Sequence, residues 1–120
     1  MPPIHCEPPE TDRYAVKRWK MAMKFTPDLD DRAAILRVVA QPTRLRLFYL
    51  LEKMGAVCVC DLGEILGVTQ SAASQHLAKF KACGLVSVRR DGQTLYYSLS
   101  DKPEVKRLRK LALGGIEMET

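Results

Sequence analysis

Residues Val57 to Gly84 read VCVCDLGEILGVTQSAASQHLAKFKACG, and this stretch decides the fold. Its first apolar residues recur at helical spacing and stop before Gly67, a residue suited to the left-handed backbone that ends a helix. Thr69 then supplies a side-chain cap for a second helix. The pattern predicts two helices joined by a tight turn, with two thiols at the entrance. The residues expected to be buried are Leu62, Ile65 and Leu66 on the first helix and Ala73, Leu77 and Phe80 on the second.

A β-hairpin is predicted directly after this motif. Residues 85–90 and 94–99 alternate apolar and polar side chains, and Asp91-Gly92 between them is a strong signal for a tight hairpin turn. A hairpin is only marginally stable alone, so this one must pack against helices. The order of elements predicts a mainly α fold with a two-stranded β-wing, a winged helix-turn-helix domain over residues 11–120.

Of the helices around the motif, one is predicted to form the core and two are predicted to contact a partner subunit. Residues 43–54, with Pro42 in the first turn, carry two apolar rows and should form the hydrophobic centre. The preceding helix, from Asp28 or Asp30 to Val39, is apolar on much of its circumference, which suggests core on one side and a partner subunit on the other. A last helix begins at Pro103, and its cap is expected from Ser100 or Asp101. We interpret this helix as a second dimerisation element, so a homodimer is expected.

The amino-terminal part has two predicted segments. Residues 1–10 are rich in proline and are expected to form a flexible arm that carries His5 and Cys6. Residues 11–25 are predicted to form a helix capped by Thr11, on which aromatic and basic residues alternate. Two interpretations of this helix stay open: a packing helix with a solvated basic face, or direct contact with DNA or a membrane.

Composition limits the classes of function. The 120 residues suit one domain, and the 19 basic and 14 acidic residues give a net charge of +5, which favours a polyanionic partner. No secretory signal is visible, and no segment approaches the ~18 consecutive apolar residues of a membrane span. We therefore expect a cytoplasmic protein without a membrane partner, whose four cysteines are reduced thiols or metal ligands. An enzyme is not expected, because no nucleophile–base pair or phosphate-binding glycine loop is present.

Three segments together resemble the ArsR/SmtB family of bacterial metal-sensing repressors. They are Cys58 to Leu62, Leu66 to Leu77, and Gly84-Leu85-Val86 with Asp91 to Tyr97. The likeness covers roughly residues 30–113. It implies a homodimer that binds an imperfect inverted repeat in double-stranded operator DNA, represses its own operon, and is released when a toxic metal or metalloid binds.

Two groups of residues are candidates for DNA contact. The first turn of a recognition helix faces base edges in the major groove, where glutamine reads adenine and serine is a permissive donor and acceptor. The residues at these positions are Gln70, Ser71, Ser74 and Gln75. Arg89 and Arg90 near the hairpin tip are expected at phosphates or in the minor groove. For His76, a residue that flanks the buried stripe and a DNA or switch role are both open.

Cys58 and Cys60 are the candidate metal ligands. Cysteines are often small core residues, but the start of a helix favours the thiolate, which binds soft metals. In a continuing helix of ~3.6 residues per turn, two residues at i and i+2 point about 200° apart. Joint chelation therefore needs a non-helical first turn or help from another chain. Cys83, at the end of the recognition helix, is expected to pack inward.

The chain departs from its relatives in the rest of the ligand set. Arsenic-responsive relatives add a third cysteine where this chain has Gly63, and cadmium- and lead-responsive ones bring two cysteines from the arm, which here offers only His5 and Cys6. Zinc-responsive relatives use the aspartate that matches Asp61 or a site on the last helix. The matching positions on that helix contain no histidine; they are Asp101, Pro103, Gly114 and Glu117.

Our hypothesis is a three-sulfur site of Cys58, Cys60 and Cys6, with His5 or Asp61 as a fourth donor. No metal is expected to be permanently bound. A thiolate-rich set suits the inducers Cd(II), Pb(II) or As(III) better than Zn(II) or a hard cation. The alternative is a thiol redox-sensing winged-helix repressor, in which Cys58 or Cys60 is oxidised or persulfidated.

Overall fold

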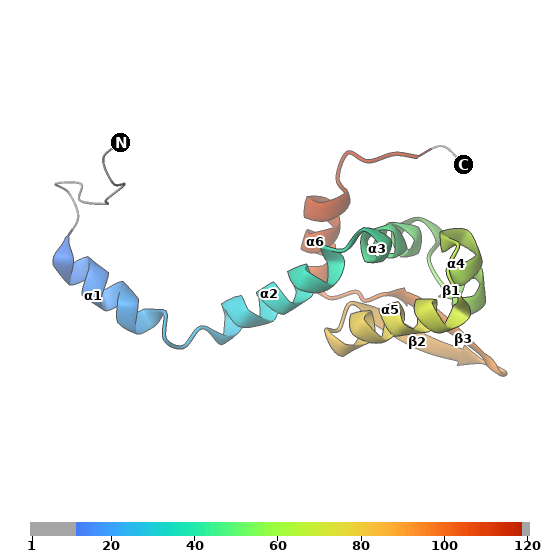
Figure 1. The fold of residues 1–120 in the computed structure, drawn as a ribbon, viewed down its shortest axis with the longest axis horizontal. Helices are drawn as coiled ribbons and strands as arrows, with labels where there is room; N and C mark the ends of the chain where they lie inside the picture. Colours follow the sequence, from blue (N-terminus) through green and yellow to red (C-terminus); the bar gives the residue numbers. More distant parts are fainter. Residues whose placement is uncertain (1–11, 119–120) are drawn as a thin grey trace. The chain divides into compact units, whose positions relative to one another are not determined.

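The computed structural model describes residues 12–118 and contains six helices and three strands in that range (Figure 1). In chain order these are α1 (Arg13–Ala22), α2 (Pro27–Val39), α3 (Pro42–Met54), β1 (Val57–Cys58), α4 (Val59–Leu66), α5 (Gln70–Ala82), β2 (Val86–Asp91), β3 (Thr94–Leu99) and α6 (Pro103–Leu113). The chain divides into two units at Arg32, inside α2. The predicted arm, residues 1–10, lies outside the described residues.

The first unit contains α1, which is shorter than the predicted helix. Asp12 caps it, because its carboxylate accepts a hydrogen bond from the backbone N–H of Tyr14 at 2.9 Å. The predicted cap, Thr11, is one residue earlier in the chain and lies outside the described residues, so the cap differs from the prediction. None of the α1 residues is buried, and Trp19 is 59% exposed.

The second unit is built around α3, as predicted. Leu47, Phe48 and Leu51 of this helix are fully or almost fully buried. Phe48 meets Phe80 of α5 edge to face, with ring centroids 6.3 Å apart. Such a pair adds specific geometry to the burial of two large apolar side chains. The recognition helix is thereby fixed to the centre of the core.

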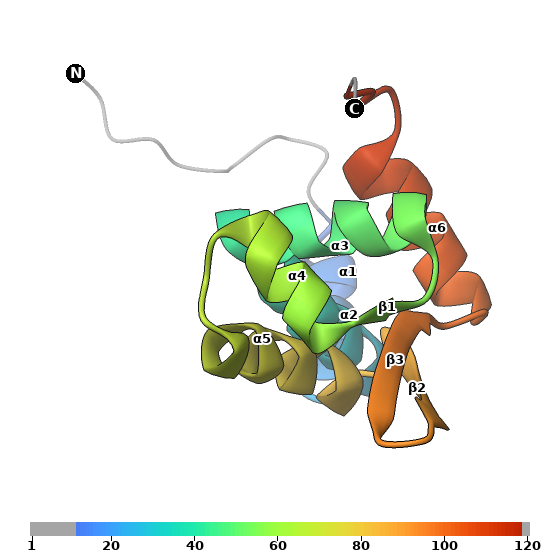
Figure 2. The same cartoon turned by 90° about the vertical axis from the view of Figure 1, so that its right-hand side faces the viewer.

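A glycine turn joins α4 to α5, and the two helices lie side by side (Figure 2). Gly67 has φ 69° and ψ 30°, and its N–H donates to the Glu64 carbonyl while that of Val68 donates to the Gly63 carbonyl. These two bonds form a Schellman motif, which ends α4 within one residue. Thr69 then caps α5 by accepting from the N–H of Ala72. The predicted burial of Ile65 was wrong: it is 50% exposed.

The sheet has three strands in the order β1-β3-β2, one more than the predicted two-stranded wing. β2 and β3 pair antiparallel around the Asp91–Thr94 closing pair. β1 consists of two residues and pairs antiparallel with β3, with Val57 opposite Tyr97 and Cys58 opposite Tyr96 (Figure 2). The strand that precedes the motif is therefore joined to the wing by backbone hydrogen bonds.

The start of α6 differs from its prediction. Lys102 is the N-cap and makes no side-chain capping bond. Ser100, one of the predicted caps, is buried and instead donates its hydroxyl to the Gly84 carbonyl at 2.9 Å. It therefore ties the end of β3 to the end of α5. Within residues 12–118, no helix combines the length and apolar composition that a membrane crossing needs.

Candidate metal centre and nucleic-acid interface

The two thiols lie where β1 passes into α4. Cys58 is the N-cap of α4, with extended backbone angles of φ −81° and ψ 157°, so it lies outside the helical spiral. Its Sγ is 3.0 Å from the Sγ of Cys60. These two sulfurs and a carboxylate oxygen of Asp61 all lie within 4.8 Å of one another. Two soft donors and one hard donor thus gather on a single turn of chain.

This donor set fits a soft metal or metalloid. Cys58 is only 9% exposed, whereas Cys60 and Asp61 are exposed, so an ion can approach from solvent. The hydrogen bond with the Cys60 thiol raises the pKa of Cys58; the backbone hydrogen bond from Asp61 lowers it, but burial and the Asp61 carboxylate raise it further. The prediction that the start of the helix favours the thiolate is therefore wrong for Cys58 in the metal-free protein. Both sulfurs must lose their protons when they bind metal, so binding releases protons.

A row of side chains crosses the sheet from this site to the wing. Cys58 lies opposite Tyr96 in β3, and Tyr96 lies opposite Arg89 in β2. Directly opposed residues in antiparallel strands present their side chains on the same face. The Arg89 guanidinium also lies over the Tyr96 ring, 5.1 Å from its centroid. We call Cys58, Tyr96 and Arg89 the cross-strand row. Sequence alternation placed Tyr96 on one face of the hairpin, but it could not show that Cys58 is its neighbour.

Two of the predicted metal ligands belong to the first ten residues of the chain. His5 and Cys6 lie outside the described residues, so the third sulfur and the nitrogen donor stay predictions. Gly63, the position at which the resemblance to arsenic-responsive repressors implies a third cysteine, is buried in α4. A Cβ atom at Gly63 would lie 3.1 Å from the carbonyl oxygen of Val68. The close approach of helix and turn therefore leaves little room for a side chain at this position.

The predicted base-reading residues all project from the first half of α5. Gln70, Ser71, Ser74 and Gln75 are exposed, while Ala73, Leu77 and Phe80 on the other side of the helix are completely buried. The buried side of α5 fixes the helix to the core, and its opposite side presents polar side chains to solvent. Such a surface suits the major groove, where donors and acceptors distinguish the base pairs.

The remaining candidates have mixed environments. His76 is half-buried, and its Nδ1 is buried without a hydrogen-bond partner among residues 12–118. Burial lowers the pKa of His76, and the positive charges of Arg44 and Lys79 lower it further. Arg89 and Arg90 are exposed on β2, where Arg89 also approaches the Asp91 carboxylate at 4.0 Å.

Cys83 packs against the core as predicted and does not join the thiol pair. It is half-buried, and its thiol donates to the carbonyls of Lys79 and Phe80 at 3.4 and 3.5 Å. Burial raises the pKa of this thiol. The donor cluster found among residues 12–118 consists of Cys58, Cys60 and Asp61 and does not include Cys83.

Comparison with known proteins agrees with this architecture. The profile described as bacterial regulatory protein, arsR family, matches residues 41–88. A cadmium resistance transcriptional regulatory protein CadC homologue of Staphylococcus aureus is 36% identical over 78 residues, which cover 65% of this chain and 64% of that protein. The match thus spans slightly less than two thirds of that relative's length. The nodulation protein NolR of Rhizobium meliloti is 42% identical over 85 residues, covering 71% and 69% of the two chains.

Solved structures extend the likeness to the fold. HlyU from Vibrio cholerae N16961 superposes with a TM-score of 0.64 at 34% identity, covering 72% of this chain and 92% of that one. The homodimeric winged helix-turn-helix DNA-binding domain Mb0332 of Mycobacterium bovis gives a TM-score of 0.62 at 29% identity, covering 85% and 82%. The predicted fold is thereby confirmed. The chain belongs to the ArsR/SmtB family of winged helix-turn-helix proteins, which regulate transcription and are not enzymes.

Proposed function

We propose that this protein is a metal- or metalloid-responsive repressor. In this proposal a homodimer binds operator DNA in the cytoplasm through α5 and the wing. Cd(II), Pb(II) or As(III) then binds Cys58 and Cys60, and the dimer leaves the DNA. The observation that carries the proposal is the cluster of two sulfurs and a carboxylate oxygen within 4.8 Å at the entrance of the helix-turn-helix. Soft thiolate donors select ions of this class over hard cations.

The rest of the ligand set is assigned to the amino-terminal arm. In this proposal residues 1–10 carry the remaining ligands, and residues 11–120 form the DNA-binding and dimerisation domain. The arm supplies Cys6 as the third sulfur, and His5 or Asp61 completes the set. The names of two relatives support a metal-responsive homodimer in general: one refers to cadmium resistance, and the Mycobacterium bovis domain is described as a homodimer.

The cross-strand row offers a direct route from metal to DNA. Metal capture pulls Cys58 toward its other ligands and shifts β1, to which Tyr96 is paired. Tyr96 supports the Arg89 guanidinium, so movement of β1 changes the position of a cation proposed to touch DNA. Tyr96→Leu should therefore keep metal affinity within about twofold but weaken metal-induced release, because it removes the aromatic surface under Arg89. Equal release by Tyr96→Leu and the wild type would exclude this route.

The decisive experiment follows fluorescence anisotropy of labelled operator DNA while Cd(II) or arsenite is added. Cys58→Ser and Cys60→Ser should bind DNA as the wild type does, since neither residue lies on the exposed face of α5, but should no longer be released. Cys83→Ser is the matched control, because its thiol is packed against the core, and it should respond normally. Normal release of both Cys58→Ser and Cys60→Ser would refute the proposed site.

A second candidate function rests on the 3.0 Å separation of the two sulfurs. Oxidation by hydrogen peroxide would join Cys58 to Cys60 in a disulfide; the two thiols lose two protons and two electrons, and peroxide is reduced to water. Peroxide would then release DNA without metal, and the mass of the peptide that contains both cysteines would fall by two hydrogens. Release by metal in the presence of excess reductant distinguishes the first proposal from this one.

A further inference from the structure

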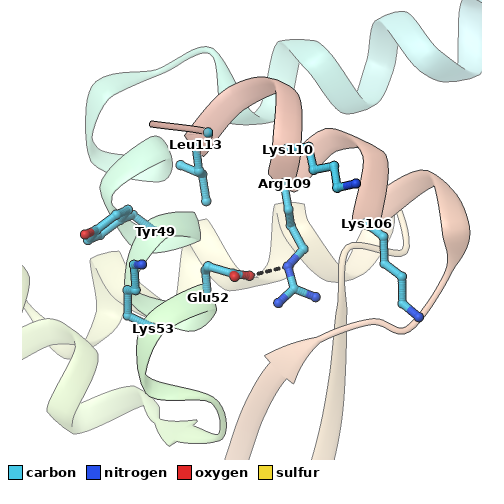
Figure 3. Close-up of a pocket in the computed structure, with 8 residues that line it drawn as sticks. Tyr49, Glu52, Lys53, Lys106, Arg109, Lys110 and Leu113 are labelled. Atoms are coloured by element: carbon cyan, nitrogen blue, oxygen red, sulfur yellow. Dashed lines mark hydrogen bonds and ion pairs between the residues drawn. The ribbon is translucent and has the colours of Figure 1, made fainter. Parts of the chain in front are cut away.

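A cationic cleft lies between α3 and α6 (Figure 3). Neither Cys58 nor Cys60 lines it. Its volume is about 380 Å³. Four cationic side chains and one carboxylate line it together with Tyr49 and Leu113; they are Lys53, Lys106, Arg109, Lys110 and Glu52. The excess of positive charge in a concave surface favours an anionic ligand.

Arg109 is held in position by an ion pair. Its Nε donates to Glu52 on α3, and both side chains are about two-thirds buried, with 30% and 28% of their surface exposed. This contact uses Nε, so the two terminal nitrogens of the guanidinium can donate to another group (Figure 3). A fixed guanidinium of this kind is well suited to bind a carboxylate through two parallel hydrogen bonds.

An apolar cavity adjoins the cationic cleft. Its volume is about 520 Å³, and it shares Tyr49 and Leu113 with the cleft as lining residues. Most of its wall is aliphatic and comes from α3, α4 and the segment after α6: Leu45, Leu50, Ile65, Leu66, Ile116 and Met118. The N–H of Met118 donates to the Tyr49 hydroxyl at 3.1 Å, which holds this last segment against α3. Both cavities lie within the second unit.

We propose that the two cavities form one binding site for an amphipathic organic anion, a carboxylate with an unbranched apolar chain. Arg109 and the lysines of the cleft bind the carboxylate, and the chain passes Tyr49 into the apolar cavity. The size of the apolar cavity falls within the range of about 300–1,000 Å³ that is usual for small-ligand sites. Such a ligand is a second input to the regulator, independent of the thiols, and it acts on α3 and α6 together.

Nuclear magnetic resonance titration of the full-length protein tests the site. The probes are decanoate below its micelle concentration, butyrate, which keeps the head and loses most of the chain, and 1-decanol, which keeps the chain and loses the charge. Decanoate should shift the amide signals around Tyr49, Arg109 and Ile65 in a saturable manner. Butyrate and 1-decanol should bind at least about tenfold more weakly, because each lacks one half of the interaction.

Matched variants assign the two halves of the site. Lys106→Gln/Lys110→Gln should weaken decanoate about tenfold, whereas Lys102→Gln/Arg107→Gln removes the same charge outside the cleft and should have no effect. Ile65→Gln should likewise weaken decanoate, whereas Met54→Gln, at a position that is also 50% exposed but does not line the cavity, should not. The proposal is overturned if decanoate causes no saturable shifts at these elements, or if each variant and its control behave alike.

Discussion

Gly63→Cys is the most informative single change, because it adds the thiol that arsenic-responsive relatives carry. The sequence pattern alone suggests that this residue would complete a three-cysteine site within one chain. The structure indicates that the substitution lowers stability, because a Cβ atom at this position would lie 3.1 Å from the Val68 carbonyl oxygen and 3.6 Å from that of Thr69. Both oxygens belong to the backbone of the turn that positions α5.

The size of the effect depends on whether the turn can move. Replacing glycine in a helix by alanine gains about 1 kcal/mol of helix propensity, and replacement by cysteine gains about 0.3 kcal/mol. Overpacking costs ~1–3 kcal/mol. The Val68 N–H donates to the Gly63 carbonyl at 3.0 Å, and this hydrogen bond keeps the turn close to α4. The Val68 carbonyl oxygen therefore cannot easily move away from a new Cβ atom. We therefore expect crowding to exceed propensity and Gly63→Cys to lose about 1–2 kcal/mol of unfolding free energy.

Thermal denaturation of the metal-free protein measures this loss. A domain of this size should lose about 4 °C in Tm for each kcal/mol of unfolding free energy. Gly63→Ala is the matched control, since it has the same Cβ without the sulfur and should also be less stable than the wild type. If Gly63→Ala is instead more stable by about 1 kcal/mol, helix propensity is unopposed and the argument from crowding is refuted.

Three further changes test the recognition helix and the wing. Burial lowers the pKa of His76, so below a pH of about 6.5 the unfolded chain binds more protons than the folded one and the stability should fall. In His76→Gln, Tm should therefore depend less on pH between about 5 and 7. An unchanged slope of Tm against pH would exclude His76 as the cause. Gln75→Ala should lose ~1–3 kcal/mol of discrimination at one base pair, with little change in Tm. The measurement is the affinity for operators that each carry one base-pair substitution, and an equal loss of affinity on all of them would contradict base reading. Arg89→Gln should weaken binding to all sequences and reduce the slope of log affinity against log salt by about one, whereas an unchanged slope would exclude a phosphate contact.

Most of the fold could be predicted because its signals are local. The glycine and threonine of the turn, the apolar stripe of α5 and the Asp91-Gly92 hairpin each report on neighbouring residues only. The errors occurred where a distant partner decides the outcome. Ser100 is one of the two predicted caps of α6, but its hydroxyl donates to the Gly84 carbonyl, sixteen residues away. Ile65 fits the helical spacing of a buried residue, yet it lies at the edge of a cavity.

The candidate metal site was predictable in its residue types but not in its geometry. Cys-x-Cys at the start of a helix indicated thiolate chemistry, and helical spacing alone separates the two side chains by about 200°. In the structure the sulfurs are 3.0 Å apart because Cys58 is extended rather than helical. No property of residues 57 and 58 indicates a strand, since a two-residue strand is too short to show alternation.

The pairing of β1 with β3 therefore explains both the site and its connection to the DNA-binding surface. Backbone bonds to Tyr96 and Tyr97 keep residues 57 and 58 extended, and this extension lets Cys58 turn its sulfur toward Cys60. The wing thus provides the geometry that makes two neighbouring cysteines a possible chelate. Because the same strand, β3, also pairs with the arginine-bearing β2, any metal that reshapes the Cys58 turn acts on an element that belongs to the wing. In the proposed sensor the path between metal and DNA is short, because the candidate ligand Cys58 and the candidate DNA contact Arg89 belong to one three-stranded sheet.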